Sequence, residues 1–284
     1  MVFHLGAAFC RSDGPLGLAA GRHQRFGVFP APANRVRRAG LAVKRAAAGP
    51  ALGAAARRSG VAGNGKGQGC KSQIPMTNHR KEQAATAALM LKAPVPGRVK
   101  TRLAVDLGAA EACAAYQRLA EHQMAQIPRD WRVVVHFDPP GAEAAMRDWL
   151  GARASFRPQV SGDLGARLTA ALADHDFSAG PLFFLGGDCP YLDAGALARA
   201  REALDAGCAD VVLVPALDGG YVLIGMRRPH PALFAGMDWS TDRVLRQTLE
   251  QAARLDLRVA RLDPMEDVDD LPSWQRAQRQ LNRS

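Results

Sequence analysis

The 284-residue sequence predicts a three-layer α/β domain with a mainly parallel central sheet, preceded by a tail without regular structure. Two observations predict the domain: short strand-like runs alternate with amphipathic helical patterns, and Gly- and Asp-containing motifs follow several of the strands. Alternating strands and helices require crossover connections, which produce parallel strands with helices on the faces of the sheet. Hydrophobic residues make up 48% of the chain, enough to bury a core.

The charge distribution separates the tail from the domain. Residues 1–75 hold 12 of the 37 Lys and Arg residues and one acid, Asp13, whereas residues 76–284 hold 25 basic and 26 acidic residues. The formal net charge of +10 therefore belongs to the tail, and the composition of the 76–284 domain gives no reason to expect a nucleic-acid partner.

The tail is rich in Ala, Gly and Arg and shows neither helical nor strand periodicity, so we expect residues 1–75 to be disordered. It fits a transit peptide, a nucleic-acid-binding tail or an upstream extension of the reading frame, and we favour the last, with Met76 as the start. No apolar run is long enough for a membrane helix, and the five cysteines form no Cys-x-x-Cys pair. We therefore expect no membrane insertion and a reducing, cytoplasmic location.

Apolar periodicity predicts the elements of the domain in order. The first is a strand at 86–91, and the second is a helix at 109–127, in which apolar residues recur every three or four positions. The helical stripe consists of Cys113, Tyr116, Ala120, Met124 and Ile127. The later strands are expected at 131–137, 181–185, 210–215, 221–225 and 257–262. The later helices are expected at 141–150, 164–172, 193–204 with Asp193 as N-cap, 241–255 behind a Ser240 or Thr241 cap, and after 271.

The loop after the first strand carries four cations within eleven residues, shaped by two prolines and Gly97. They are Lys92, Arg98, Lys100 and Arg102. Ligands of parallel sheets bind at the carboxyl ends of the strands, so a basic loop there suits a diphosphate. The alternative is a solvated charge run. The loop matches neither a Walker loop nor Gly-x-Gly-x-x-Gly.

Acidic residues follow two other strands. Asp188 comes after Gly186-Gly187 at the end of the 181–185 strand and is a candidate Mg²⁺ or Mn²⁺ ligand, because hard cations prefer carboxylates and phosphates. The alternative is a turn or cap aspartate. The acidic cluster at 263–270 supplies a second ligand or forms a solvated turn. The neighbouring Cys189 is interpreted as a buried residue rather than as a nucleophile.

Two further motifs have both a functional and a structural interpretation. In the motif at 218–221, Asp-Gly-Gly also suits a hairpin turn, and Tyr221 either stacks on a base or sugar or packs in the core. Asp163 and Arg167 open a helix with the spacing of an ion pair, so they bind a ligand or each other.

Taken in order, five motifs resemble a bacterial glycosyltransferase-like family of the GT-A, nucleotide-diphospho-sugar transferase superfamily. They are Lys-x-Pro-x-Pro-Gly-x-Val-Lys-Thr-Arg-Leu at 92–103, Asp-Leu-Gly-x-Arg at 163–167, Gly-Asp-Cys-Pro at 187–190, Asp-Gly-Gly-Tyr-x-Leu-Ile-Gly at 218–225 and Trp-Ser-Thr at 239–241. Some members of the family are labelled arsenosugar-biosynthesis glycosyltransferases. The resemblance covers about residues 85–275, and a more distant one extends to guanylyl- and cytidylyltransferases of cofactor synthesis.

The resemblance implies a single GT-A, Rossmann-like domain with a nucleotide at the first loop and a divalent metal. It assigns the donor phosphates to Lys92, Gly97, Lys100, Arg102, Asp163 and Arg167. It assigns the acceptor pocket to Gly219, Gly220, Tyr221, Trp239, Ser240 and Thr241. Asp188 and Asp269 would hold the metal, with a late Asp-x-Asp matched at 267–269 or, alternatively, from Asp263. Asp218 is the candidate base and Lys100 the second candidate catalytic residue.

We expect a metal-dependent glycosyltransferase that uses a nucleotide-sugar donor and a small-molecule acceptor. One alternative is a nucleotidyltransferase that transfers NMP from an NTP to a phosphorylated acceptor, and another is a nucleotide-binding protein without turnover. The sequence departs from both enzyme patterns. Cys189-Pro190 replaces the second acid that many GT-A glycosyltransferases carry at the metal site, and Pro-Val-Pro-Gly at 94–97 replaces the Gly-rich loop of nucleotidyltransferases.

Overall fold

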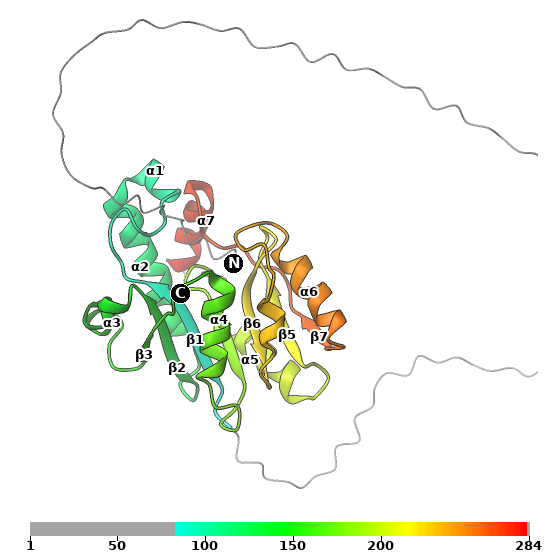
Figure 1. The fold of residues 1–284 in the computed structure, drawn as a ribbon. Helices are drawn as coiled ribbons and strands as arrows, with labels where there is room; N and C mark the ends of the chain where they lie inside the picture. The colour runs from blue at the N-terminus through cyan, green and yellow to red at the C-terminus, as the bar shows by residue number, and fades with distance from the viewer. Residues whose placement is uncertain (1–82, 283–284) are drawn as a thin grey trace, which may run out of the picture. The chain divides into compact units, whose positions relative to one another are not determined.

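Seven strands form one sheet in the order β3-β2-β1-β4-β6-β5-β7 in the computed structural model, which describes residues 83–282 (Figure 1). All neighbouring strands are parallel except β6, which runs antiparallel to β4 and β5. The strands are β1 (Thr86–Lys92), β2 (Arg132–Asp138), β3 (Ser155–Pro158), β4 (Leu182–Leu185), β5 (Val211–Pro215), β6 (Tyr221–Met226) and β7 (Val259–Arg261). The sheet confirms the mainly parallel α/β fold, and the predicted tail lies outside the described residues.

Helices flank this sheet (Figure 1). They are α1 (Leu103–Leu107), α2 (Ala109–Gln126), α3 (Glu143–Leu150), α4 (Leu164–Ala173), α5 (Ala194–Asp205), α6 (Val244–Arg254) and α7 (Leu271–Leu281), with short 3-10 turns at Pro140–Ala142 and Pro231–Phe234. The predicted stripe of α2 is buried along its length, and the Asp193 side chain caps α5 by accepting from the Ala196 N–H. None of the helices among the described residues has the length and apolarity needed to cross a membrane.

Within residues 83–282, two apolar clusters fill the interior. The larger one surrounds the sheet and includes Phe183 and Phe184 of β4. The smaller one joins α1, α2 and α7 through Leu103, Leu119 and Trp274, and it also contains Val268. The smaller cluster places the chain before α7 next to the loop after β1, although these segments lie far apart in the sequence.

Several boundaries differ from those predicted. The helix α6 begins at Val244 instead of residue 241, because Ser240 has a φ of 65° and the Thr241 hydroxyl donates to the Asp238 carbonyl in a preceding turn. The strand β7 is shorter than the 257–262 prediction. The elements β3 and α1 were not predicted, because they have only four and five residues and are too short for a periodic signal.

Candidate functional site

Three carboxylates meet beyond the carboxyl end of β4. Asp188 follows β4, and Asp267 and Asp269 precede α7; one oxygen from each lies within 4.8 Å of the others. The structure thus brings the acids of the 267–269 segment to Asp188, whereas Asp263 is exposed. In the sequence, Asp267 belongs both to the late Asp-x-Asp motif and to the 263–270 acidic cluster from which a second metal ligand was expected.

Backbone contacts hold the two halves of this triad together. The Val268 N–H donates to the Asp188 carbonyl at 3.0 Å, and the segment before it pairs with the end of β5 through Met265 and Pro215. Directly after the triad, Asp270 and Ser273 form a reciprocal capping box that starts α7. Asp267 and Asp269 therefore lie on a segment that is held by hydrogen bonds at both ends.

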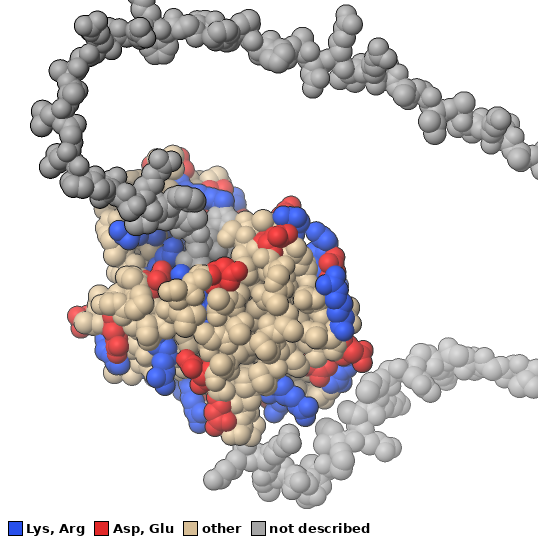
Figure 2. Space-filling model, in the orientation of Figure 1, with Lys and Arg blue, Asp and Glu red and all other residues tan. Residues whose placement is uncertain are grey.

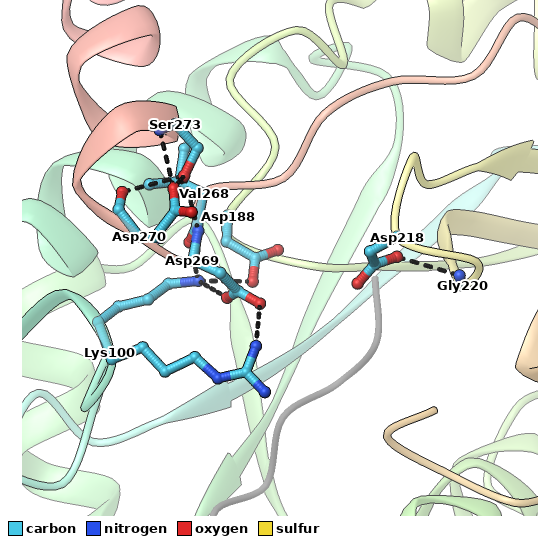
Figure 3. A network of polar contacts seen from close by, with 9 residues as sticks. Lys100, Asp188, Asp218, Gly220, Val268, Asp269, Asp270 and Ser273 are labelled. Carbon is cyan, nitrogen blue, oxygen red and sulfur yellow. Dashed lines mark hydrogen bonds and ion pairs between the residues drawn. The ribbon is translucent and has the colours of Figure 1, made fainter. Parts of the chain in front are cut away.

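Lys100 reaches Asp188 and Asp269 of the triad from the loop after β1 (Figure 3). Its Nζ donates to Asp188 Oδ2 at 3.0 Å, to Asp269 Oδ1 at 3.1 Å and to the Val268 carbonyl. The side chain is only 8% exposed. Burial by itself would lower the pKa of Lys100, but the Asp188 and Asp269 carboxylates outweigh burial and raise it, so the ammonium stays charged.

Two carboxylate oxygens of the triad are buried without a partner among the described residues. They are Oδ1 of Asp188 and Oδ2 of Asp267. Burial, followed by the charge of Asp188 and then of Asp218 and Asp269, raises the pKa of Asp267 to about 7. A buried carboxylate oxygen without a donor is costly, and a cation relieves that cost.

The donor set fits Mg²⁺ or Mn²⁺. Both ions take carboxylate oxygens, and Mg²⁺ in particular is commonly held by one or two carboxylates plus substrate phosphates. Asp188, Asp267 and Asp269 would hold the ion, and the two unpartnered oxygens are the evidence for this fit.

Much of the loop between β1 and α1 is open to solvent. Residues 95–98 are exposed, Gly97 has a φ of 79° and Val99 is buried as an anchor. Arg102 is mostly exposed and lies 3.6 Å from Asp269 Oδ2. The loop therefore presents cations to solvent directly beside the acidic triad.

Lys92 ends β1 and is held by a tyrosine that gave no functional signal in the sequence. The Tyr116 hydroxyl accepts from the Lys92 N–H and donates to the Lys92 carbonyl, both at 2.9 Å. Burial lowers the pKa of Lys92, with Asp138 opposing and Arg167 adding to that effect. The hydroxyl of Tyr116 thus fixes the backbone at the start of the loop.

Arg167 lies in a second polar cluster, at the carboxyl ends of β1 and β2. Its Nη1 donates to Gln159 Oε1 at 2.6 Å and lies 3.6 Å from Asp138 Oδ2. The buried Gln159 amide in turn donates to the carbonyls of Leu91 and His136. Neither Asp138 nor Gln159 was predicted as a site residue. Asp138 directly follows the predicted 131–137 strand, which was an available signal, whereas Gln159 follows β3, which the sequence did not indicate.

Asp163 serves as the N-cap of α4, where its Oδ1 accepts from the Ala166 N–H at 2.8 Å. Its side chain forms no ion pair with Arg167 within the described part of the chain, since Arg167 turns toward Asp138. Next to this cap, a Cβ on Gly165 would come within 2.8 Å of the Trp239 indole nitrogen. The Trp-Ser-Thr segment therefore packs against the start of α4.

The 218–221 motif forms the turn between β5 and β6. Asp218 Oδ1 accepts from the Gly220 N–H at 3.0 Å, and Asp218 lies on the other side of Asp188 from Lys100 (Figure 3). Tyr221 is 1% exposed and packs in the core, which was the second of its two predicted roles. Its ring is therefore not available to stack on a ligand, whereas Asp218 and Gly219 are half-buried.

Two remaining predictions concern residues around these clusters. Thr241 shapes the turn before α6, and Ser240 is exposed at its left-handed position. Cys189 is buried, as interpreted from the sequence, and burial raises its pKa to about 12. A thiol in that state is a poor nucleophile.

Charged side chains of both signs are interspersed on the face in Figure 2, with no continuous basic area among its described residues. This distribution matches the near balance of 25 basic and 26 acidic residues in 76–284. The charges around the triad therefore indicate the kind of ligand better than the overall charge of the domain does.

Comparison with known proteins places this geometry in a family. The model of a family described as an uncharacterized protein conserved in bacteria (DUF2064) matches residues 105–241. A crystal structure from Desulfovibrio desulfuricans, provisionally assigned as a nucleotide-diphospho-sugar transferase, is 30% identical, with 66% of this chain and 82% of that chain covered and a TM-score of 0.61. The chain belongs to the GT-A-like nucleotide-diphospho-sugar transferase superfamily.

Two further structures are less similar to this superfamily member. The 4-diphosphocytidyl-2C-methyl-D-erythritol synthase of Anaerococcus prevotii is 8% identical over 70% of this chain and 99% of that chain, with a TM-score of 0.47. A Mycobacterium tuberculosis protein in complex with manganese is 18% identical over the same shares, with a TM-score of 0.41. A search among curated proteins gave no match.

Proposed function

We propose that this protein is a metal-dependent glycosyltransferase that transfers a sugar from a nucleotide-sugar donor to a small-molecule acceptor. The observation that carries the proposal is the buried triad of Asp188, Asp267 and Asp269, with two unpartnered oxygens beside a basic loop. This juxtaposition suits a ligand that combines a divalent cation with a diphosphate. Membership in the superfamily supports the same substrate class.

The chain's own cations are arranged to bind the donor. Lys100 and Arg102 lie next to the triad and would contact the diphosphate, while Lys92 and Arg167 extend the positive charge along the strand ends. When bound, Mg²⁺ or Mn²⁺ would supply charge stabilisation to the leaving diphosphate. Cations of the protein that are already in position beside the diphosphate would stabilise the negative charge that develops on it in the transition state.

Asp218 is our choice for the base that accepts the proton of the acceptor hydroxyl. It is half-buried, its side chain accepts from the Gly220 N–H, and it lies on the side of Asp188 opposite Lys100 (Figure 3). This arrangement would place the acceptor between Asp218 and the donor.

The three cysteines of residues 83–282 are free, which supports the cytoplasmic location expected from the sequence.

Thermal stabilisation of the full-length protein tests the proposal. The ligands are UDP-, GDP-, CDP- and ADP-sugars and the four NTPs, each with and without Mn²⁺. The variants are Asp188→Asn and, as a matched control, Asp263→Asn at an exposed acid outside the triad. A ligand at about one hundred times its dissociation constant adds roughly 2.7 kcal/mol of stability.

We expect a Mn²⁺-dependent shift with a nucleotide-sugar that Asp188→Asn abolishes and Asp263→Asn preserves. A shift with an NTP alone, accompanied by pyrophosphate release in the presence of an acceptor, would replace glycosyl transfer by nucleotidyl transfer. A folded protein that no nucleotide stabilises would refute both forms of the proposal.

A further inference from the structure

The acidic triad is already partly occupied by cations of the chain itself. Oδ1 of Asp269 accepts from Lys100, and Oδ2 of Asp269 lies 3.6 Å from Arg102. Oδ2 of Asp188 likewise accepts from Lys100, and Oδ1 of Asp188 has no partner among the described residues. Both oxygens of Asp269 thus lie near a cation, so a metal ion that takes all three carboxylates competes with at least one cation of the chain for Asp269.

Lys100 and Arg102 are held very differently. The side chain of Lys100 is 8% exposed and makes three contacts, whereas that of Arg102 is 62% exposed and has one longer contact. Lys100 lies between Asp188 and Asp269, where it repels any cation bound to the same two acids. Arg102 approaches Asp269 from solvent and can turn away at little cost.

The backbone of Lys100 is also unusual. Its φ is 46°, in the left-handed region that non-glycine residues seldom adopt. The same strained residue carries the ammonium into the triad, so the loop conformation and the ion contacts depend on each other. The exposed residues 95–98 lie immediately before this position in the chain.

We propose that the Lys100 ammonium is an internal counter-ion that occupies the cation site of Asp188 and Asp269, so that a divalent cation binds the triad only as Lys100 leaves it. This inference rests on the proposed function, since it concerns the same site. Lys100 released from the acids can contact the phosphates of an anionic ligand, because the loop that carries it borders solvent. Cation binding and phosphate binding are then linked through one side chain.

Mn²⁺ binding to the full-length protein, measured from the electron paramagnetic resonance signal of free Mn²⁺, tests this competition without an activity assay. The test variant is Lys100→Met, which keeps the aliphatic stem and removes the ammonium. The control is Arg102→Met, which removes an equal charge beside the same Asp269. We expect Lys100→Met to bind Mn²⁺ at least about tenfold more tightly than the wild type, and Arg102→Met to differ by less than about threefold.

A second measurement uses the wild type and does not depend on a variant that folds. Lysine acetylation by acetic anhydride is followed by peptide mass spectrometry, with Lys92 as the internal reference. We expect Lys100 to be protected without Mn²⁺ and to become modified when Mn²⁺ is added. Lys100→Gly, which suits a φ of 46°, replaces Lys100→Met in the binding experiment if the latter does not fold.

The outcomes separate this inference from the proposed function. Equal Mn²⁺ affinity in the wild type and Lys100→Met, or Lys100 that stays protected with Mn²⁺ bound, would overturn the counter-ion role and leave the metal-dependent function intact. Equal gains in Lys100→Met and Arg102→Met would show a general charge effect and overturn it as well. No Mn²⁺ binding in any of the proteins would refute the metal site itself.

Discussion

Nζ of Lys100 lies 3.0 Å from Oδ2 of Asp188, although 88 positions separate the two residues in the sequence. Both side chains are largely buried. Desolvation makes the net contribution of such a pair to stability small or even unfavourable, but the loss of one partner leaves an uncompensated charge. The contact therefore makes the first loop of the domain and the end of β4 energetically dependent on each other.

A double-mutant cycle should reveal this dependence. Without divalent cations, Lys100→Met leaves three carboxylates with little compensation and should lower the free energy of unfolding by about 3–5 kcal/mol. Asp188→Asn removes one of the negative charges, so the double variant should lose less than the sum of the single changes, with a coupling of about 0.5–3 kcal/mol. Urea unfolding of all four proteins measures the cycle. Additive effects would show that the contact does not couple the two segments.

Regular elements were predictable because their residues repeat a pattern. Cys113, Tyr116 and Ala120 recur at helical spacing and are all buried in α2. The short β3 offers no such repeat, because Ser155 and Arg157 are exposed and only Phe156 is buried. A strand of this kind is defined by its pairing with β2, which a local pattern does not record.

The candidate site was predictable where a motif follows a strand, as at Lys100 and Asp188. The register of the late Asp-x-Asp was open in the sequence, because acids are clustered throughout 263–270. Tertiary contacts bring the 267–269 segment to Asp188, since the Val268 N–H bonds to the Asp188 carbonyl. The support of Lys92 by Tyr116 had no signal, since an aromatic residue on an apolar helical stripe is typical of core packing.

The turn at Gly219 should not tolerate a side chain. Gly219 has a φ of 92°, and a Cβ built there would lie 2.3 Å from the carbonyl oxygen of Asp242. Gly219→Ala should therefore combine backbone strain with a backbone clash and destabilise the protein by roughly 2–4 kcal/mol. It should also displace Asp218 and reduce turnover. Thermal unfolding and steady-state kinetics measure the two effects.

Gly97 provides the matched control for this substitution. Its φ of 79° is similarly left-handed, but no atom lies within 4 Å of a built Cβ. Gly97→Ala should show the strain alone, about 1 kcal/mol. If the two variants lose equal stability, the close approach of the Asp242 backbone to a Cβ at position 219 does not contribute to the destabilisation.

His136 should make stability depend on pH. Burial lowers its pKa to about 4 in the folded protein, with Asp174 opposing and Arg157 adding to the effect. The unfolded chain has the ordinary value near 6.5, so above that pH both states are neutral and the full stability is present. As the pH falls from 6.5 toward 4, the unfolded state binds the proton first, and roughly 3 kcal/mol of stability is lost.

Urea unfolding at several pH values between 4 and 7 tests this expectation. The wild type should lose stability more steeply on acidification than His136→Leu, which has no group to protonate at this position. The comparison between the two proteins removes the contribution of the carboxylates, which titrate in both. Parallel pH profiles would show that His136 does not cause the acid sensitivity.

Asp218→Asn separates chemistry from structure at the proposed base. The amide oxygen of Asn can still accept from the Gly220 N–H, so the turn and the melting temperature should be unchanged. An amide cannot accept the proton of the acceptor hydroxyl, and turnover should fall by about 10²- to 10⁴-fold while Mn²⁺ and donor affinity persist. Asp263→Asn, at an exposed acid, should retain full turnover. Undiminished turnover of Asp218→Asn would exclude Asp218 as the base and direct the search to another group beside the triad.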